Sequence, residues 1–169
     1  TYDIVYELSG DTIVNGAFET VKGLTELYFN DNITVIGSTI STYSSLNEIH
    51  IGKGCVKIGK LAFASSIRLR KLDLSHCTEL REIGDSAFQG STVLSEINFP
   101  NHPITIKRSA FGRTAISKLV IPSGSIIGRF AFSRCYNLDD LTGLGTDLTV
   151  DIGRLNDEKK RYWYCVFSG

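Results

Sequence analysis

Apolar residues recur along this chain in an order that neither a helix nor a strand explains alone. Residues 81–100 read REIGDSAFQGSTVLSEINFP, with apolar positions at Ile83, Ala87, Phe88, Leu94, Ile97 and Phe99. A helix repeats its apolar positions every 3.6 residues or so, and a strand about every second residue. Because neither period fits all six positions, the segment reads as two different elements joined together.

The same pattern returns along most of the chain. Its centre is an Ala-Phe pair, found at Ala17-Phe18, Ala62-Phe63, Ala87-Phe88, Ala110-Phe111 and Ala131-Phe132, with Ile40 in the slot of one divergent copy. Successive slots lie 22, 23, 25, 23 and 21 residues apart, which gives six copies over residues 13–148. An Ile, usually followed by Gly, precedes each pair, and an apolar trio follows it. A period of this length is typical of a stacked repeat protein.

Each copy predicts an arm joined to a strand. The trio L-x-x-I-x-I ends in an alternating segment, which predicts a short half-buried strand, and stacked copies place such strands side by side in a parallel sheet. The arm carries the Ala-Phe slot, so we expect a stacked spine of Phe18, Ile40, Phe63, Phe88, Phe111 and Phe132. Glycine after the Ile suits either a positive φ or close packing between arms.

The repeat unit resembles the leucine-rich repeats of the BspA-like family, with a unit close to I-G-x-x-A-F-x-x-C-x-x-L-x-x-I-x-I-P. Cys135 occupies the cysteine slot and Pro100 and Pro122 the closing proline, although other copies carry Val21, Ser66 and Ser91 in place of the cysteine. The resemblance implies an α/β-type right-handed solenoid, with a parallel sheet on the concave face and irregular, 3-10 or short helical arms on the convex face. It also implies a secreted or cell-surface protein that adheres to a host or neighbouring-cell protein.

The chain is expected to form a single leucine-rich-repeat domain over residues 1–169. Residues 1–12 are interpreted as an N-terminal cap or partial repeat, either a hairpin or the tail of a preceding repeat. Residues 149–169 are interpreted as a partial repeat and a C-terminal cap, in which Tyr162, Trp163, Tyr164 and Phe167 would cover the last copy. Those aromatic residues could instead contact a partner, or the array could be cut there. The start at Thr1 indicates a processed or trimmed fragment.

Composition narrows the classes of partner. The chain of 169 residues carries 18 basic and 18 acidic residues, so it lacks the basic footprint of a nucleic-acid or anionic-membrane binder. No apolar run approaches the roughly 18 residues that span a bilayer. We therefore expect no nucleic acid partner and no membrane insertion of this segment.

Outward positions on the predicted strands form the candidate binding surface, because parallel sheets are normally covered on both faces whereas these strands alternate. The candidate partner-binding residues are Tyr28, His50, Asp73 and Asn98 in a central column, and Glu26, Glu48, Lys71, Glu96 and Lys118 in the column before it. The leading hypothesis is noncatalytic recognition of a protein partner. Glycan binding through Tyr28, Asp73 and Asn98 is one alternative, and a structural spacer within a larger surface protein is another.

No catalytic constellation is indicated. Glu26 and Glu48 lie on adjacent predicted strands, where they are interpreted as solvated like charges rather than an acid/base pair. The chain has no G-x-S-x-G, phosphate-loop or H-E-x-x-H motif, so neither an enzyme nor a cofactor is expected.

The cysteines and histidines leave three readings open. Cys55, Cys77 and His102, with His76 adjacent, lie just beyond their strands, where they could bind zinc, form a Cys55–Cys77 disulfide or stay unlinked. Because no C-x-x-C or H-x-x-x-H spacing is present, unlinked thiols are favoured over both and no metal is assigned. Cys135 is interpreted as a small core residue.

Overall fold

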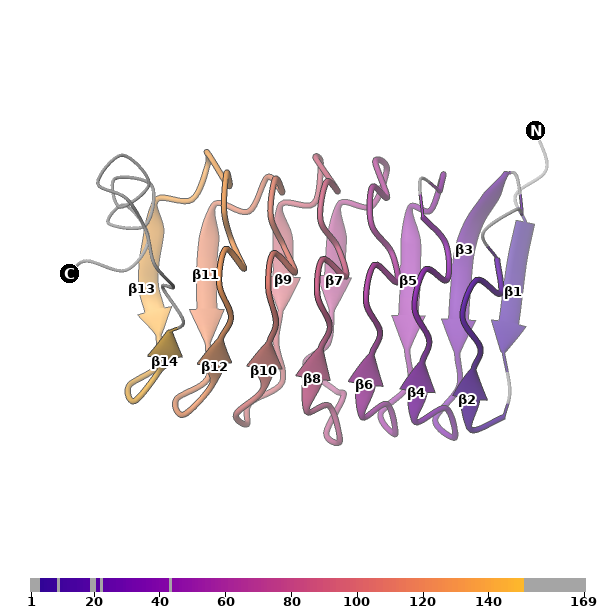
Figure 1. Cartoon of the computed structure of the whole chain (residues 1–169), viewed down its shortest axis with the longest axis horizontal. Helices are drawn as coiled ribbons and strands as arrows, with labels where there is room; N and C mark the ends of the chain where they lie inside the picture. Colours follow the sequence, from indigo (N-terminus) through magenta and orange to yellow (C-terminus); the bar gives the residue numbers. More distant parts are fainter. Residues whose placement is uncertain (1–3, 9, 19–20, 22, 43, 151–169) are drawn as a thin grey trace.

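The chain winds into successive turns, each with one long and one short β-strand. The computed structural model describes residues 4–8, 10–18, 21, 23–42 and 44–150. The long strands are β1 (Ile4–Leu8), β3 (Leu24–Phe29), β5 (Glu48–Ile51), β7 (Lys71–Asp73), β9 (Glu96–Asn98), β11 (Lys118–Ile121) and β13 (Asp140–Leu144). The short strands are β2 (Thr12–Ile13), β4 (Val35–Ile36), β6 (Lys57–Ile58), β8 (Glu82–Ile83), β10 (Thr105–Ile106), β12 (Ile126–Ile127) and β14 (Thr149–Val150). Figure 1 shows the short strands in a row in front of the long ones.

The short strands form one continuous sheet that the sequence pattern did not indicate. All seven are parallel, in the order β14-β12-β10-β8-β6-β4-β2, and the register aligns the Ile before each glycine with the Ile of the next copy. Irregular, 3-10 or short helical arms had been expected; in the described ranges the arms hold these strands and turns, with no helix. The described part of the chain is therefore an all-β solenoid rather than an α/β one.

The arms are bonded to one another through their backbones. The N–H of Phe63 donates to the carbonyl of Ala87 at 2.8 Å, and the N–H of Phe88 donates to Ala110 at 2.8 Å. Before each Ala or its equivalent the backbone takes a positive φ between 51° and 69°, at Gly16, Thr39, Leu61, Ser86, Ser109 and Phe130. This left-handed turn is shared by all six copies, although only one of them uses glycine for it.

The predicted phenylalanine spine is present in the core. Phe63 stacks on Phe88 with ring centroids 5.5 Å apart, Phe88 on Phe111 at 5.3 Å, and Phe111 on Phe132 at 5.5 Å. Ile40 fills the slot of the divergent copy and is fully buried. Each aromatic pair contributes about 0.5–1.5 kcal/mol beyond its burial.

Glycine follows the short-strand Ile because adjacent backbones touch there. A Cβ on Gly84 would lie 2.7 Å from the carbonyl carbon of Gly59 and 2.8 Å from the amide nitrogen of Lys60. Gly84 does not have a positive φ, so close packing accounts for it. In the fifth copy Lys107 takes this slot and keeps the backbone bond to the carbonyl of Ile83 at 2.9 Å.

The long strands are parallel but do not form the single sheet that was predicted. They pair as β1-β3-β5, β7-β9 and β11-β13. Between β5 and β7 the carbonyl of Ile51 is bonded by side chains instead, with the His76 Nε2 at 2.7 Å and the Cys77 thiol at 3.4 Å. The copy with these two residues is the longer one.

The two ends differ in what the structure describes. β1 pairs parallel with β3, so it takes the place of a strand from a preceding repeat rather than one arm of a hairpin. The expected C-terminal cap, with Tyr162, Trp163, Tyr164 and Phe167, lies outside the described residues.

Candidate functional site

The predicted binding residues lie on one surface, which we call the long-strand face: the outward side chains of β3, β5, β7, β9 and β11. Alternation creates this face, because the residues between them, among them Leu27, Ile49, Leu72, Ile97 and Leu119, are buried in the core. The strand register pairs Glu26 with Glu48, Tyr28 with His50, Lys71 with Glu96, Asp73 with Asn98, and Lys118 with Asp140. That this face is concave stays a prediction.

Four residues at the N-terminal end of the face form an aromatic–carboxylate cluster: Glu26, Tyr28, Glu48 and His50. The Tyr28 and His50 rings stack with centroids 4.1 Å apart and planes 5° from parallel. The Tyr28 hydroxyl donates to Glu26 Oε2 at 3.0 Å, and His50 Nε2 lies 3.0 Å from Glu48 Oε2. The bond to Glu26 raises the pKa of Tyr28. Each carboxylate is thus held by an aromatic neighbour on its own strand.

The middle of the face is organised by an ion pair. Lys71 Nζ lies 2.7 Å from Glu96 Oε1, which holds the pKa of Glu96 below and that of Lys71 above their ordinary values. The Asn98 amide also donates to Glu96 Oε1, at 3.5 Å. Asp73 instead accepts the Ser75 hydroxyl at 2.7 Å and its N–H at 3.0 Å, which lowers the pKa of Asp73.

The C-terminal end of the face is less polar. Lys118 Nζ lies 3.4 Å from Asp140 Oδ2, and Val120, in the central column, is 50% exposed. Exposed ion pairs such as this one contribute about 0–1 kcal/mol each, so they order side chains more than they stabilise the fold.

The structure contains no Cys55–Cys77 disulfide. Cys55, Cys77 and Cys135 are free thiols and buried, which confirms Cys135 as a core residue. Burial raises the pKa of the Cys55 and Cys77 thiols to about 12. No group of three metal-ligating side chains gathers among the described residues.

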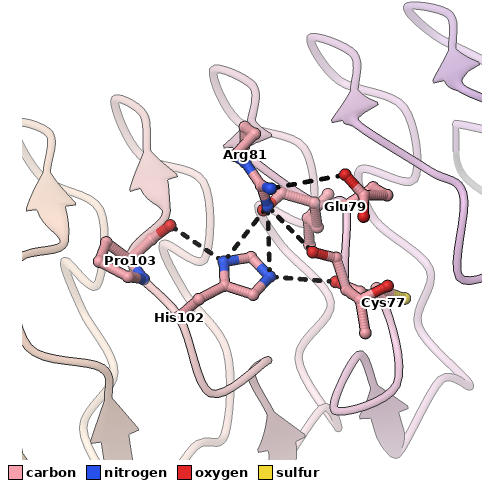
Figure 2. Close-up of polar contacts among 7 residues, drawn as sticks. Cys77, Glu79, Arg81, His102 and Pro103 are labelled. Atoms are coloured by element: carbon pink, nitrogen blue, oxygen red, sulfur yellow. Dashed lines mark hydrogen bonds and ion pairs between the residues drawn. The ribbon is translucent and has the colours of Figure 1, made fainter.

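His102 joins two loops rather than meeting a thiol. Figure 2 shows its ring between the loops that follow β7 and β9. His102 Nε2 lies 3.3 Å from the carbonyl oxygen of Cys77, and Nδ1 lies 3.2 Å from that of Pro103. The Arg81 guanidinium donates to the carbonyls of Thr78 and Leu80 at 3.0 and 3.2 Å, so this cluster ties the longer loop down.

A charged cluster on the short-strand side was not anticipated. Glu82 Oε1 lies 3.0 Å from Lys57 Nζ, and Glu82 Oε2 lies 3.1 Å from Lys107 Nζ. The three residues belong to three neighbouring copies. Burial favours a higher pKa for Glu82, but the two lysine hydrogen bonds outweigh it and lower that pKa. The Ile-Gly segment had not been assigned to a strand from the sequence, so the residue before the Ile was not identified as a strand position.

The fold and the repeat together define a leucine-rich-repeat solenoid. Residues 11–142 match six copies of the family model described as "BspA type Leucine rich repeat region". The chain belongs to this family, as the repeat unit had indicated.

Three solved structures are similar in fold. A leucine rich cell surface protein from Faecalibacterium prausnitzii A2-165 is 24% identical with a TM-score of 0.55, over 82% of this chain and 43% of its own. The pneumococcal vaccine antigen PcpA is 22% identical with a TM-score of 0.57, over 84% and 34%. The T. pallidum leucine rich repeat protein is 17% identical with a TM-score of 0.57, over 98% and 84%. This chain therefore spans less than half the length of the first two proteins.

A search of curated protein sequences found no match. Within the described residues there is no helix of the length and hydrophobicity needed to cross a membrane.

Proposed function

We propose that this chain is a noncatalytic binding module of a secreted or cell-surface protein, and that it recognises a protein partner through the long-strand face. The observation that supports this most directly is the preordered polar surface of that face. Tyr28, His50, Glu26 and Glu48 hold one another in place, and Lys71, Glu96 and Asn98 do the same beside them. A surface that is already ordered loses little side-chain entropy on binding.

The location of the module rests on its relatives. Two of the similar solved proteins are described as a cell surface protein and a vaccine antigen. Family and fold are typically noncatalytic, which agrees with a role in adhesion.

Glycan binding by the same face is the second candidate, supported by Tyr28 and Asn98 in its central column. The geometry favours it less, because stacking covers one face of the Tyr28 ring with His50. Asp73, which would serve a sugar hydroxyl, already accepts two hydrogen bonds from Ser75. A structural spacer would require neither contacts to a protein partner nor contacts to a sugar.

The test measures saturable binding of the labelled chain to intact bacterial and animal cells. A double variant, Tyr28→Ala with His50→Ala, is compared with Lys60→Ala, a matched change on the arm side. We expect the double variant to bind at least about tenfold more weakly and Lys60→Ala to bind normally. Protease treatment of the cells should abolish binding, whereas loss after periodate oxidation of sugars alone would favour the glycan. Binding to no cell type would favour the spacer.

A further inference from the structure

The zero net charge of the chain conceals a strong separation of charge along it. Residues 97–138 contain no Asp or Glu, yet they carry six basic residues: Lys107, Arg108, Arg113, Lys118, Arg129 and Arg134. Since the whole chain has net charge 0, the remaining residues carry 0 − 6 = −6. A second stretch without Asp or Glu, residues 49–72, also carries six basic residues, so the fifth and sixth copies hold one of two basic segments of the chain.

Four of these residues are arginines on two adjacent arms, and we call them the arginine patch: Arg108, Arg113, Arg129 and Arg134. The two lysines are already paired, Lys107 with Glu82 at 3.1 Å and Lys118 with Asp140 at 3.4 Å. Arg108 and Arg129 come shortly after β10 and β12, and the other two arginines lie two residues beyond the spine phenylalanines Phe111 and Phe132.

The arms align these arginines in pairs. The N–H of Ser109 donates to the carbonyl of Arg129 at 3.0 Å, which places Arg108 beside Arg129. The N–H of Arg113 donates to the carbonyl of Ser133 at 2.8 Å, which places Arg113 beside Arg134. Hydrogen-bonded neighbouring backbones of this kind lie about 4.8 Å apart.

The patch is accessible and faces away from the long strands. Arg108, Arg113 and Arg134 are exposed and make no ion pair with the described residues, whereas Arg129 is half-buried, with its guanidinium 4.7 Å from the centroid of the Phe130 ring. The carboxylate of the neighbouring fourth copy, Asp85, accepts the backbone N–H of Arg108 at 3.1 Å and marks the edge of the patch. Figure 1 shows the arms above β10 and β12 side by side, in front of the long strands.

We propose that the arginine patch binds a linear anionic polysaccharide with sulfate or phosphate groups along its chain, on the side opposite the long-strand face. Guanidinium groups pair with such tetrahedral oxyanions through two parallel N–H bonds. Two aligned pairs can engage successive charges of one polymer, which strengthens binding through multivalency.

A polysaccharide fits this surface better than a single-stranded nucleic acid. Proteins that bind single strands stack successive bases on several aromatic rings. Where the structure describes side chains, Tyr136 is the one aromatic residue that is largely exposed, at 78%. Arg129 lies over the Phe130 ring and covers it.

The test uses the full chain and immobilised dextran sulfate, with unsulfated dextran as the uncharged reference. The patch variant combines Arg108→Gln, Arg113→Gln and Arg134→Gln. The control variant, Lys53→Gln with Lys60→Gln and Arg68→Gln, removes the same charge from the second and third copies. We expect wild type to bind dextran sulfate but not dextran, the patch variant to bind at least about tenfold more weakly, and the control within about twofold of wild type. Unchanged thermal melting would show that both variants fold.

Two further ligands complete the experiment. Phosphomannan in place of dextran sulfate tells whether phosphate or sulfate is preferred, and binding to either supports the proposal. A single-stranded oligonucleotide of equal charge should bind more weakly than the polysaccharides, and tighter binding to it would overturn the assignment. An equal loss in the patch and control variants, or no binding to any charged polysaccharide, would overturn the patch itself. The long-strand face is unchanged in the patch variant, so this result is independent of the partner proposed for that face.

Discussion

At the scale of single residues, the position of a cysteine within its repeat determines whether its thiol is buried. The backbone turns place Cys55 in the same column as Ile33 and Leu80, and all three are buried. Cys55 is therefore a small apolar core residue in a column that elsewhere holds larger ones. Cys77 lies in the longer loop, where its thiol donates to the carbonyl of Ile51.

This burial predicts slow thiol chemistry in the folded chain. The thiolate is the reactive form, and the pKa values of Cys55 and Cys77 are raised to about 12. In a Cys165→Ser variant at pH 8, we expect the Cys55 and Cys77 thiols of the native protein to react with Ellman's reagent roughly 1,000-fold more slowly than those of the unfolded protein. Absorbance after unfolding without reductant should report three thiols. Only one thiol would indicate a Cys55–Cys77 disulfide, and rapid native labelling would show that the thiols are accessible.

At the scale of elements, the short-strand sheet joins the copies through side chains as well as backbone. The register places Glu82 of β8 between Lys57 of β6 and the end of β10, and its carboxylate bonds both Lys57 and Lys107. Only 25% of the Glu82 side chain is exposed, so solvent screens this cluster less than it screens the pairs on the long-strand face.

Glu82 gives the stability of this sheet a pH dependence. Because the pKa of Glu82 is lower in the folded chain than in the unfolded one, its contribution is present above the unfolded value of 4.5 and is lost as the pH falls through the folded pKa. We expect Glu82→Gln to lower the free energy of unfolding by about 1 kcal/mol at pH 7. Urea unfolding at decreasing pH should show this difference shrinking towards zero.

The matched control is Glu79→Gln. Glu79 is 58% exposed and lies 3.5 Å from Arg81, so its loss should cost at most about 0.5 kcal/mol. An equal loss of stability in the two variants, or a loss for Glu82→Gln that persists at low pH, would contradict the role assigned to the cluster of Glu82, Lys57 and Lys107.

At the scale of the whole molecule, the sequence was informative wherever side-chain type repeats. The Ala-Phe slot predicted the stacked spine, and the alternating trio predicted long strands with a polar outer face. The second sheet was not predicted because its strands are only two residues long, too short for a period to be visible. The left-handed turn was hidden because Leu61, Ser86 and Phe130 share a backbone conformation rather than a side-chain type.

The candidate site was predictable to a similar degree. Register followed from the repeat, so the columns through Tyr28 and His50 and through Lys71 and Glu96 could be aligned in advance. The contacts within them depend on rotamers, which a sequence pattern does not contain. The hydrogen bonds of Ser75 to Asp73 and of His76 to the carbonyl of Ile51 both depend on such rotamers.

The spine also predicts how the array loses structure. Phe88 stacks on the rings of both neighbouring copies, at 5.5 and 5.3 Å, and in a repeat protein stability depends on such nearest-neighbour contacts. We expect Phe88→Ala to cost about 3–5 kcal/mol. Hydrogen exchange should then rise most for arm amides bonded across the altered copy, such as those of Phe63 and Phe88, and least for that of Phe18 in the first copy. Tyr136→Ala, at a side chain 78% exposed, should change neither stability nor exchange. A rise of equal size from β3 to β13 would mean that the array unfolds as one cooperative unit.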